Sequence, residues 1–93
     1  MSGSTEGADG ANIELMAAWR FVLRSSDPAT RAWLGNARPL TVHESTLMVA
    51  VPNEFTRERI ESRLRGSIEE FLSDAYRRPM HVAVTIEPDL ELN

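Results

Sequence analysis

Residues 46–55, with the sequence TLMVAVPNEF, hold the change from strand to helix on which the fold depends. The first part alternates branched apolar residues with milder ones, which predicts a strand with one apolar face. The branched residues are Leu47, Val49 and Val51. Pro52 ends the strand, because proline has no N–H for the ladder. Asn53 is a favourable N-cap, so a helix should begin at Glu54.

On the N-terminal side, the pattern predicts two helices and one strand. A helix from Ile13 to about residue 24 is expected to begin at the cap Asn12. Asp27 and Pro28 should start a second helix that ends at residue 34, since proline is favoured at the first helical position. Residues 39–43 alternate again, and a turn at 44–45 would join them to the strand at 46–51 as a hairpin.

On the C-terminal side, the helix from Glu54 should run to about Tyr76, and residues 82–86 should form a third strand. Each strand then has one branched face, which a layer of helices must cover. We therefore expect a two-layer α+β domain, a three-stranded sheet covered on one face, with the strand at 39–43 in the middle. The domain should span residues 13–87, after a disordered leader at 1–12 and before a linker that starts at 88–93.

The composition excludes several classes of function. The 93 residues contain no cysteine, so disulfides and cysteine zinc sites are excluded. Ten arginines and fourteen acidic residues give a net charge of −4, which argues against tight, sequence-blind binding to nucleic acid. No apolar run is long enough for a membrane span, and no secretion signal begins the chain. A cytoplasmic protein without membrane contact is the expectation.

Residues suited to catalysis are few. His43 and His81 fall on the mild strand faces, and two histidines are too few for a zinc site. The glycines form no phosphate-binding loop, because the two outside the first ten residues, Gly35 and Gly66, stand alone. We expect no enzyme activity, no cofactor and no metal.

Phe55 is the residue that the helical pattern explains least. The apolar residues of the long helix share an arc of about 120°. They are Ile60, Leu64, Ile68, Phe71, Leu72 and Ala75. Phe55 points away from this arc. Either it packs on the preceding loop or a bent first turn, or it is an exposed anchor for a partner, with Asn53, Arg57 and Arg59 as a polar rim.

The first helix has more apolar residues than one face can bury. The helical wheel places Trp19 in the core stripe, and Phe21 falls toward the polar side. Some of this apolar surface should therefore be shared with another chain. Trp33, in the second helix, is more simply a core tryptophan.

Four segments together resemble a known family. They are Trp19, then Trp33-Leu34 with Pro39-Leu40, then residues 46–55, and finally residues 60–64. Over residues 15–87 the chain resembles the N-terminal domain, domain I, of the bacterial replication initiator DnaA. The resemblance implies a KH-like α-α-β-β-α-β fold without enzymatic activity. It also implies weak self-association and the recruitment of replicative helicase and initiation regulators.

The resemblance also implies roles for single residues. Trp19 corresponds to the self-association tryptophan, which favours its partial exposure; Ala18 replaces a frequent leucine and should weaken the contact. Phe55 corresponds to the helicase-contact phenylalanine, and Asn53 belongs to the same regulator-binding surface, with Arg59 at its rim. An acidic helicase contact of some relatives is Ala29 here, and Asp27 is the nearest acid.

Two alternative functions are left open by the residues. KH-like folds often bind single-stranded nucleic acid, and four arginines decorate the long helix at 57, 59, 63 and 65. Glutamates at 54, 58 and 61 should largely cancel this charge. We therefore expect weak nucleic-acid binding or none. A helical regulatory adaptor of an unrelated system is the other alternative.

Overall fold

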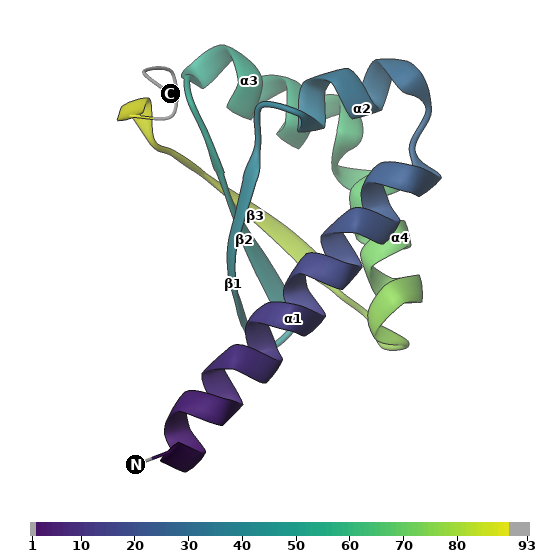
Figure 1. The fold of residues 1–93 in the computed structure, drawn as a ribbon. Coiled ribbons are helices and arrows are strands. Elements are labelled where there is room, and N and C mark those ends of the chain that lie inside the picture. The colour runs from purple at the N-terminus through teal and green to yellow at the C-terminus, as the bar shows by residue number, and fades with distance from the viewer. Residues whose placement is uncertain (1, 90–93) are drawn as a thin grey trace.

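The computed structural model describes the backbone of residues 2–89 and the side chains of residues 13–89. The elements are α1 (Ser2–Ser25), α2 (Pro28–Leu34), β1 (Arg38–His43), β2 (Thr46–Val51), α3 (Glu54–Arg59), the π-helical turn η1 (Ile60–Leu64), α4 (Arg65–Tyr76) and β3 (His81–Ile86) (Figure 1). This order confirms the predicted two-layer α+β fold. In Figure 1, α1 and α4 lie beside the sheet, and these two helices also pack on each other.

The sheet has the strand order β1-β2-β3, so β2 is central. β1 pairs with β2 antiparallel, and β3 pairs with β2 parallel. The expectation that the strand at 39–43 is central was wrong. The hairpin places β1 on one edge of β2, and the crossover through α3, η1 and α4 brings β3 to the other edge.

A β-bulge interrupts β1 at Leu40. Pro39 pairs with Val49, whereas the next paired residue, Thr41, faces Met48. Leu40 therefore has no partner of its own and is 43% exposed, so it does not continue the apolar face that alternation predicted. Proline is tolerated here because β1 is an edge strand.

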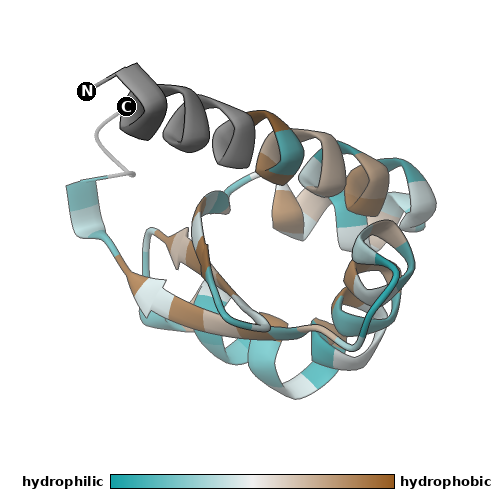
Figure 2. Ribbon diagram, turned by 90° about the horizontal axis from the view of Figure 1, so that it is seen from below, coloured by the Kyte–Doolittle hydropathy of each residue, from teal (hydrophilic) through white to brown (hydrophobic). Residues whose placement is uncertain are grey.

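The core lies between the branched faces of the strands and the helices. Its buried members come from α1, α2, β2, η1, α4, β3 and the loop before β3: Leu15, Ala18, Trp19, Val22, Leu34, Leu47, Val49, Val51, Ile60, Ile68, Leu72, Met80 and Val82. Figure 2 shows hydrophobic colour on the strands and on the described part of α1, and hydrophilic colour on the turns. In the described part of the chain, every buried side-chain nitrogen or oxygen has a hydrogen-bond partner.

The predicted long helix, residues 54–76, contains the π-helical turn η1 near its middle. Its core-facing residues follow a spacing of four: Thr56, Ile60, Leu64, Ile68 and Leu72. In a straight α-helix four such steps would rotate the side chains by roughly 160° away from the core. The π turn is wider than an α turn and takes up this drift. Residues on both sides of η1 can therefore face one core.

The first helix begins earlier than predicted. α1 starts at Ser2, so Asn12 lies within the helix and is not its cap. The proposed leader at 1–12 and linker at 88–93 stay predictions, because the side chains of 1–12 and residues 90–93 lie outside what is described. The end of α1 at Ser25 is as predicted. Arg31 of α2 stabilises that end by donating to the carbonyls of Leu23 (3.0 Å) and Ser26 (2.9 Å).

Candidate docking surfaces

The start of α3 determines where Phe55 points. The Asn53 Oδ1 accepts hydrogen bonds from the Thr56 N–H (2.9 Å) and from the Thr56 hydroxyl (3.0 Å), as an N-cap should. Thr56 is only 3% exposed, so its side of the first helical turn faces the core. Phe55, the preceding residue, is 65% exposed. The prediction that Phe55 points away from the core is therefore confirmed.

Phe55 does not stand alone, because the ring of Trp33 packs against it. The two ring centroids are 5.4 Å apart, with the planes tilted by 58°. The guanidinium of Arg59 lies over the Trp33 ring, 5.1 Å from its centroid, in a cation–π contact. We call Trp33, Phe55 and Arg59 the Phe55 site. It joins α2 to α3 at the surface.

Trp33 was expected in the core, and this expectation was wrong. Trp33 is half-buried and lies outside the core cluster, to which its neighbour Leu34 belongs. α2 has only seven residues, so little of its surface can face the interior. Leu34 occupies the buried position, and the Trp33 ring instead packs against Phe55 at the surface.

A shallow hollow of about 160 Å³ extends from Phe55 along α3 and η1. It is lined by Phe55, Glu58, Arg59, Ser62 and Arg63. The neighbouring Arg57 and Arg65 are occupied elsewhere. Arg57 pairs with Glu54 and with Glu61 (2.6 Å), and Arg65 lies 3.9 Å from Glu61. The predicted cancellation of charge thus holds for Arg57 and Arg65, whereas no described carboxylate pairs with Arg59 or Arg63.

Two carboxyl groups near the helix starts have lowered pKa values. The hydrogen bond from Arg57 holds the pKa of Glu54 below its usual value. The Thr30 hydroxyl does the same for Asp27, which stands exposed at the N-cap position of α2. Asp27 lies at the other end of α2 from Trp33, so the structure does not place this predicted contact residue within the Phe55 site.

The predicted self-association residues of α1 are buried in their own chain. Trp19 is 5% exposed and Ala18 is 6% exposed, so the expected partial exposure of Trp19 was wrong. The wheel had placed Trp19 in the core stripe, and that placement holds. On the outer side of α1, Ile13 is 70% exposed and Met16 is 45% exposed. These two residues, with Ala17 and Arg20, line a second shallow hollow, which we call the α1 stripe.

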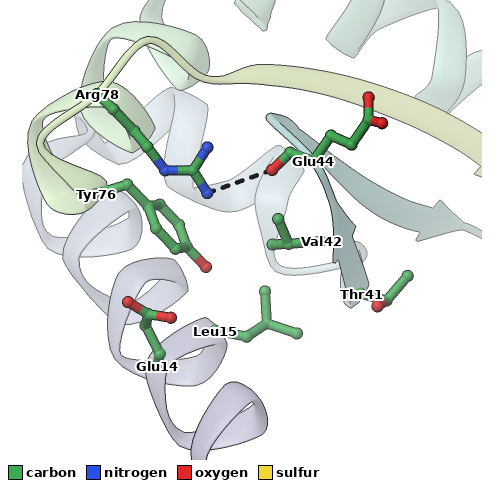
Figure 3. Close-up of a pocket in the computed structure, with 7 residues that line it drawn as sticks. All are labelled: Glu14, Leu15, Thr41, Val42, Glu44, Tyr76 and Arg78. Atoms are coloured by element: carbon green, nitrogen blue, oxygen red, sulfur yellow. Dashed lines mark hydrogen bonds between the residues drawn. The ribbon is translucent and has the colours of Figure 1, made fainter.

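A third hollow, of about 270 Å³, lies between α1, the β1–β2 hairpin and the end of α4 (Figure 3). Arg78 crosses its rim and donates to the Ser45 hydroxyl (3.0 Å) and the Glu44 carbonyl (3.2 Å). Its guanidinium also lies 5.6 Å from the centroid of the Tyr76 ring. Arg78 thus ties the end of α4 to the hairpin turn, a contact that sequence analysis missed because the partners are far apart in the chain.

Tyr76 has a raised pKa in this third hollow. Burial is the main cause, and the Glu14 carboxylate adds to it, while Arg78 acts in the opposite direction. In Figure 3 the Tyr76 hydroxyl points toward the space between α1 and the hairpin.

His43 and His81 are both exposed. The His81 Nδ1 lies 3.9 Å from the Glu69 Oε2, and the same carboxylate oxygen accepts the Val82 N–H (2.9 Å). Within the described residues, no three histidine, aspartate or glutamate side chains gather as metal ligands would. No helix in that part of the chain is long and apolar enough to cross a membrane.

Comparison with known proteins identifies relatives of the whole patterned region. The family model described as DnaA N-terminal domain matches residues 16–74, which include all of the Phe55 site. The chain is 50% identical over 90 residues to the chromosomal replication initiator protein DnaA of Cutibacterium acnes (strain DSM 16379 / KPA171202). The match covers 96% of this chain and 18% of that protein. The chain thus spans less than a fifth of the length of this relative.

Proposed function

The chain belongs to the DnaA N-terminal domain family, and from this premise we propose that it is a non-enzymatic protein–protein interaction module of a cytoplasmic replication initiator. Its proposed partners are the replicative helicase, initiation regulators and further copies of the initiator. One observation carries the proposal: Phe55 is 65% exposed, although a loop or the core could have covered it.

The Phe55 site has the features of a binding hot spot. Aromatic residues and arginine dominate the energy of protein interfaces, and Trp33, Phe55 and Arg59 supply all of these types in one place. The Asn53 cap fixes the helix start, so Phe55 is held in position before a partner arrives. We propose that helicase and regulators dock here and that Asn53 supports the site as the N-cap of α3.

Self-association is proposed to use the α1 stripe. Because Trp19 and Ala18 are buried, they would support this surface from the inside, and the contact itself would be made by Ile13, Met16 and Ala17. A stripe on one helix buries little area, so the contact should be weak alone, on the order of 10 μM to 1 mM. Many initiators held side by side would raise the effective concentration, and weak contacts would then hold an assembly together.

The helicase contact can be tested by titrating the purified helicase into the ¹⁵N-labelled chain. We expect Phe55→Ala to weaken binding at least several-fold, because the anchor is lost. Leu40→Ala is the matched control, since it removes another exposed apolar side chain from an unrelated edge of the fold. Equal affinities of the two variants and the parent chain would contradict the proposal.

Self-association can be tested by sedimentation equilibrium of the chain over a wide concentration range. We expect Met16→Glu to remove concentration-dependent association, because it places a charge in the α1 stripe. Leu40→Glu serves as the control for an added surface charge. Association that persists in Met16→Glu would exclude this surface.

The nucleic-acid alternative has one observation in its favour. Exposed aromatic rings beside arginines can stack and hold single-stranded bases. However, Arg57 and Arg65 are paired with glutamates, and the chain as a whole is acidic. Salt-dependent binding of an oligonucleotide at micromolar concentration would favour this second function.

A further inference from the structure

The charge around the Phe55 site is opposite to that of the whole chain. The chain has a net charge of −4, yet the hollow beside Phe55 is lined by two arginines and one glutamate. Arg59 and Arg63 are four residues apart on the same side of the helix, an arrangement that costs energy when both carry the same charge. No described carboxylate forms an ion pair with either residue, and Glu58 is the one acidic residue in the lining of the hollow.

The two arginines are well suited to carboxylates. A guanidinium presents its N–H groups as a planar fork that matches a carboxylate, and such charge-assisted hydrogen bonds are among the stronger ones. Arg59 is also held by its contact with the Trp33 ring, so less freedom is lost when it binds. Its position links the aromatic part of the site to the cationic part.

We propose that the segment covering the Phe55 site in a partner is an acidic peptide segment with a central apolar residue. The apolar residue would contact Phe55 and Trp33, and flanking carboxylates would bind Arg59 and Arg63. This inference rests on the proposed function of the same site and adds the chemistry of the partner. A peptide fits better than nucleic acid, because only two unpaired cations line the hollow, and nucleic-acid affinity grows with the number of phosphates neutralised.

The test uses short synthetic peptides and the ¹⁵N-labelled 93-residue chain. One peptide has glutamates on both sides of a central Leu-Phe pair; in two matched peptides, glutamines or lysines replace the glutamates. We expect the acidic peptide to shift the resonances of Trp33, Phe55 and Arg63, and to bind about three- to tenfold more tightly than the glutamine peptide. Raising the salt concentration should reduce this difference.

Two variants with the same charge change complete the test. Arg63→Glu should remove the advantage of the acidic peptide, whereas Arg65→Glu should retain it, because Arg65 lies outside the hollow and faces Glu61. Equal binding of the three peptides would overturn the inference, as would displacement of the acidic peptide by a thymidine oligonucleotide. Failure of the proposed function looks different: Phe55→Ala would then leave helicase binding unchanged, whatever the peptides do.

Discussion

Replacing Phe55 by alanine separates a docking residue from a core residue, and the structure predicts the size of the effect. Phe55 is 65% exposed, so only about a third of its side chain is removed from water. Full burial of a phenylalanine contributes about 1.5–3 kcal/mol, and a third of that is roughly 0.5–1 kcal/mol. The ring contact with Trp33 adds up to about 1 kcal/mol, and the higher helix propensity of alanine offsets part of the loss.

We therefore expect Phe55→Ala to lower the free energy of unfolding by about 1 kcal/mol. In a domain of this size that corresponds to a fall in Tm of roughly 4–8 °C. Leu72→Ala is the comparison, because Leu72 is fully buried and its truncation should cost about 2–5 kcal/mol. Urea denaturation should be followed by far-UV circular dichroism, since the fluorescence of Trp33 itself responds to the loss of the neighbouring ring.

The two variants should also differ in binding. Phe55→Ala should remain folded and lose helicase binding at least several-fold, whereas Leu72→Ala should lose stability and keep the affinity of its folded fraction. A loss of about 3 kcal/mol in Phe55→Ala would refute the reasoning, because it would place the ring among the core residues.

Three further predictions concern other parts of the fold. Trp19→Ala should destabilise the chain by about 3–5 kcal/mol in urea denaturation, because the side chain is buried; a loss below 1 kcal/mol would contradict its place in the core. Asn53→Ala should cost about 0.5–2 kcal/mol through loss of the cap and also weaken helicase binding; unchanged stability and binding would show that the cap does not support the site. Tyr76, the only tyrosine, should ionise above its usual pKa of 10.0 in an absorbance titration, and Glu14→Gln should shift that pKa downward. Because its folded-state pKa is raised, Tyr76 contributes stability below pH 10 that is lost as the pH rises through the folded-state pKa. If Glu14→Gln leaves the midpoint of the Tyr76 titration unchanged, the Glu14 carboxylate is excluded as a cause of the raised pKa.

Features set by neighbouring residues were predictable from the sequence. The strand at 46–51, the stop at Pro52 and the cap at Asn53 follow one another directly, so the start of α3 and the outward direction of Phe55 could be predicted. Trp19 shows the same rule. Its spacing from Leu15 and Val22 placed it in the core, and only the family resemblance argued for its exposure.

Features set by distant contacts were not predictable. Trp33 packs on Phe55, which follows 22 residues later, and the sequence of α2 alone does not indicate this contact. The bulge at Leu40 depends on how β1 aligns with β2, and the order of the strands depends on which edge of β2 the crossover reaches. The π turn of η1 lets core residues before and after it face the same core, and this depends on the packing of the whole helix on the sheet. Local periodicity contains none of this information.

One titration decides whether a partner covers the exposed rings on α2 and α3. Amide resonances of the labelled chain would be recorded while unlabelled replicative helicase is added. We expect shifts or line broadening to concentrate at Trp33, Phe55 and Arg59, with little change at the edge strand β1. A saturable response elsewhere on the surface, with these three residues unaffected, would contradict docking at the Phe55 site.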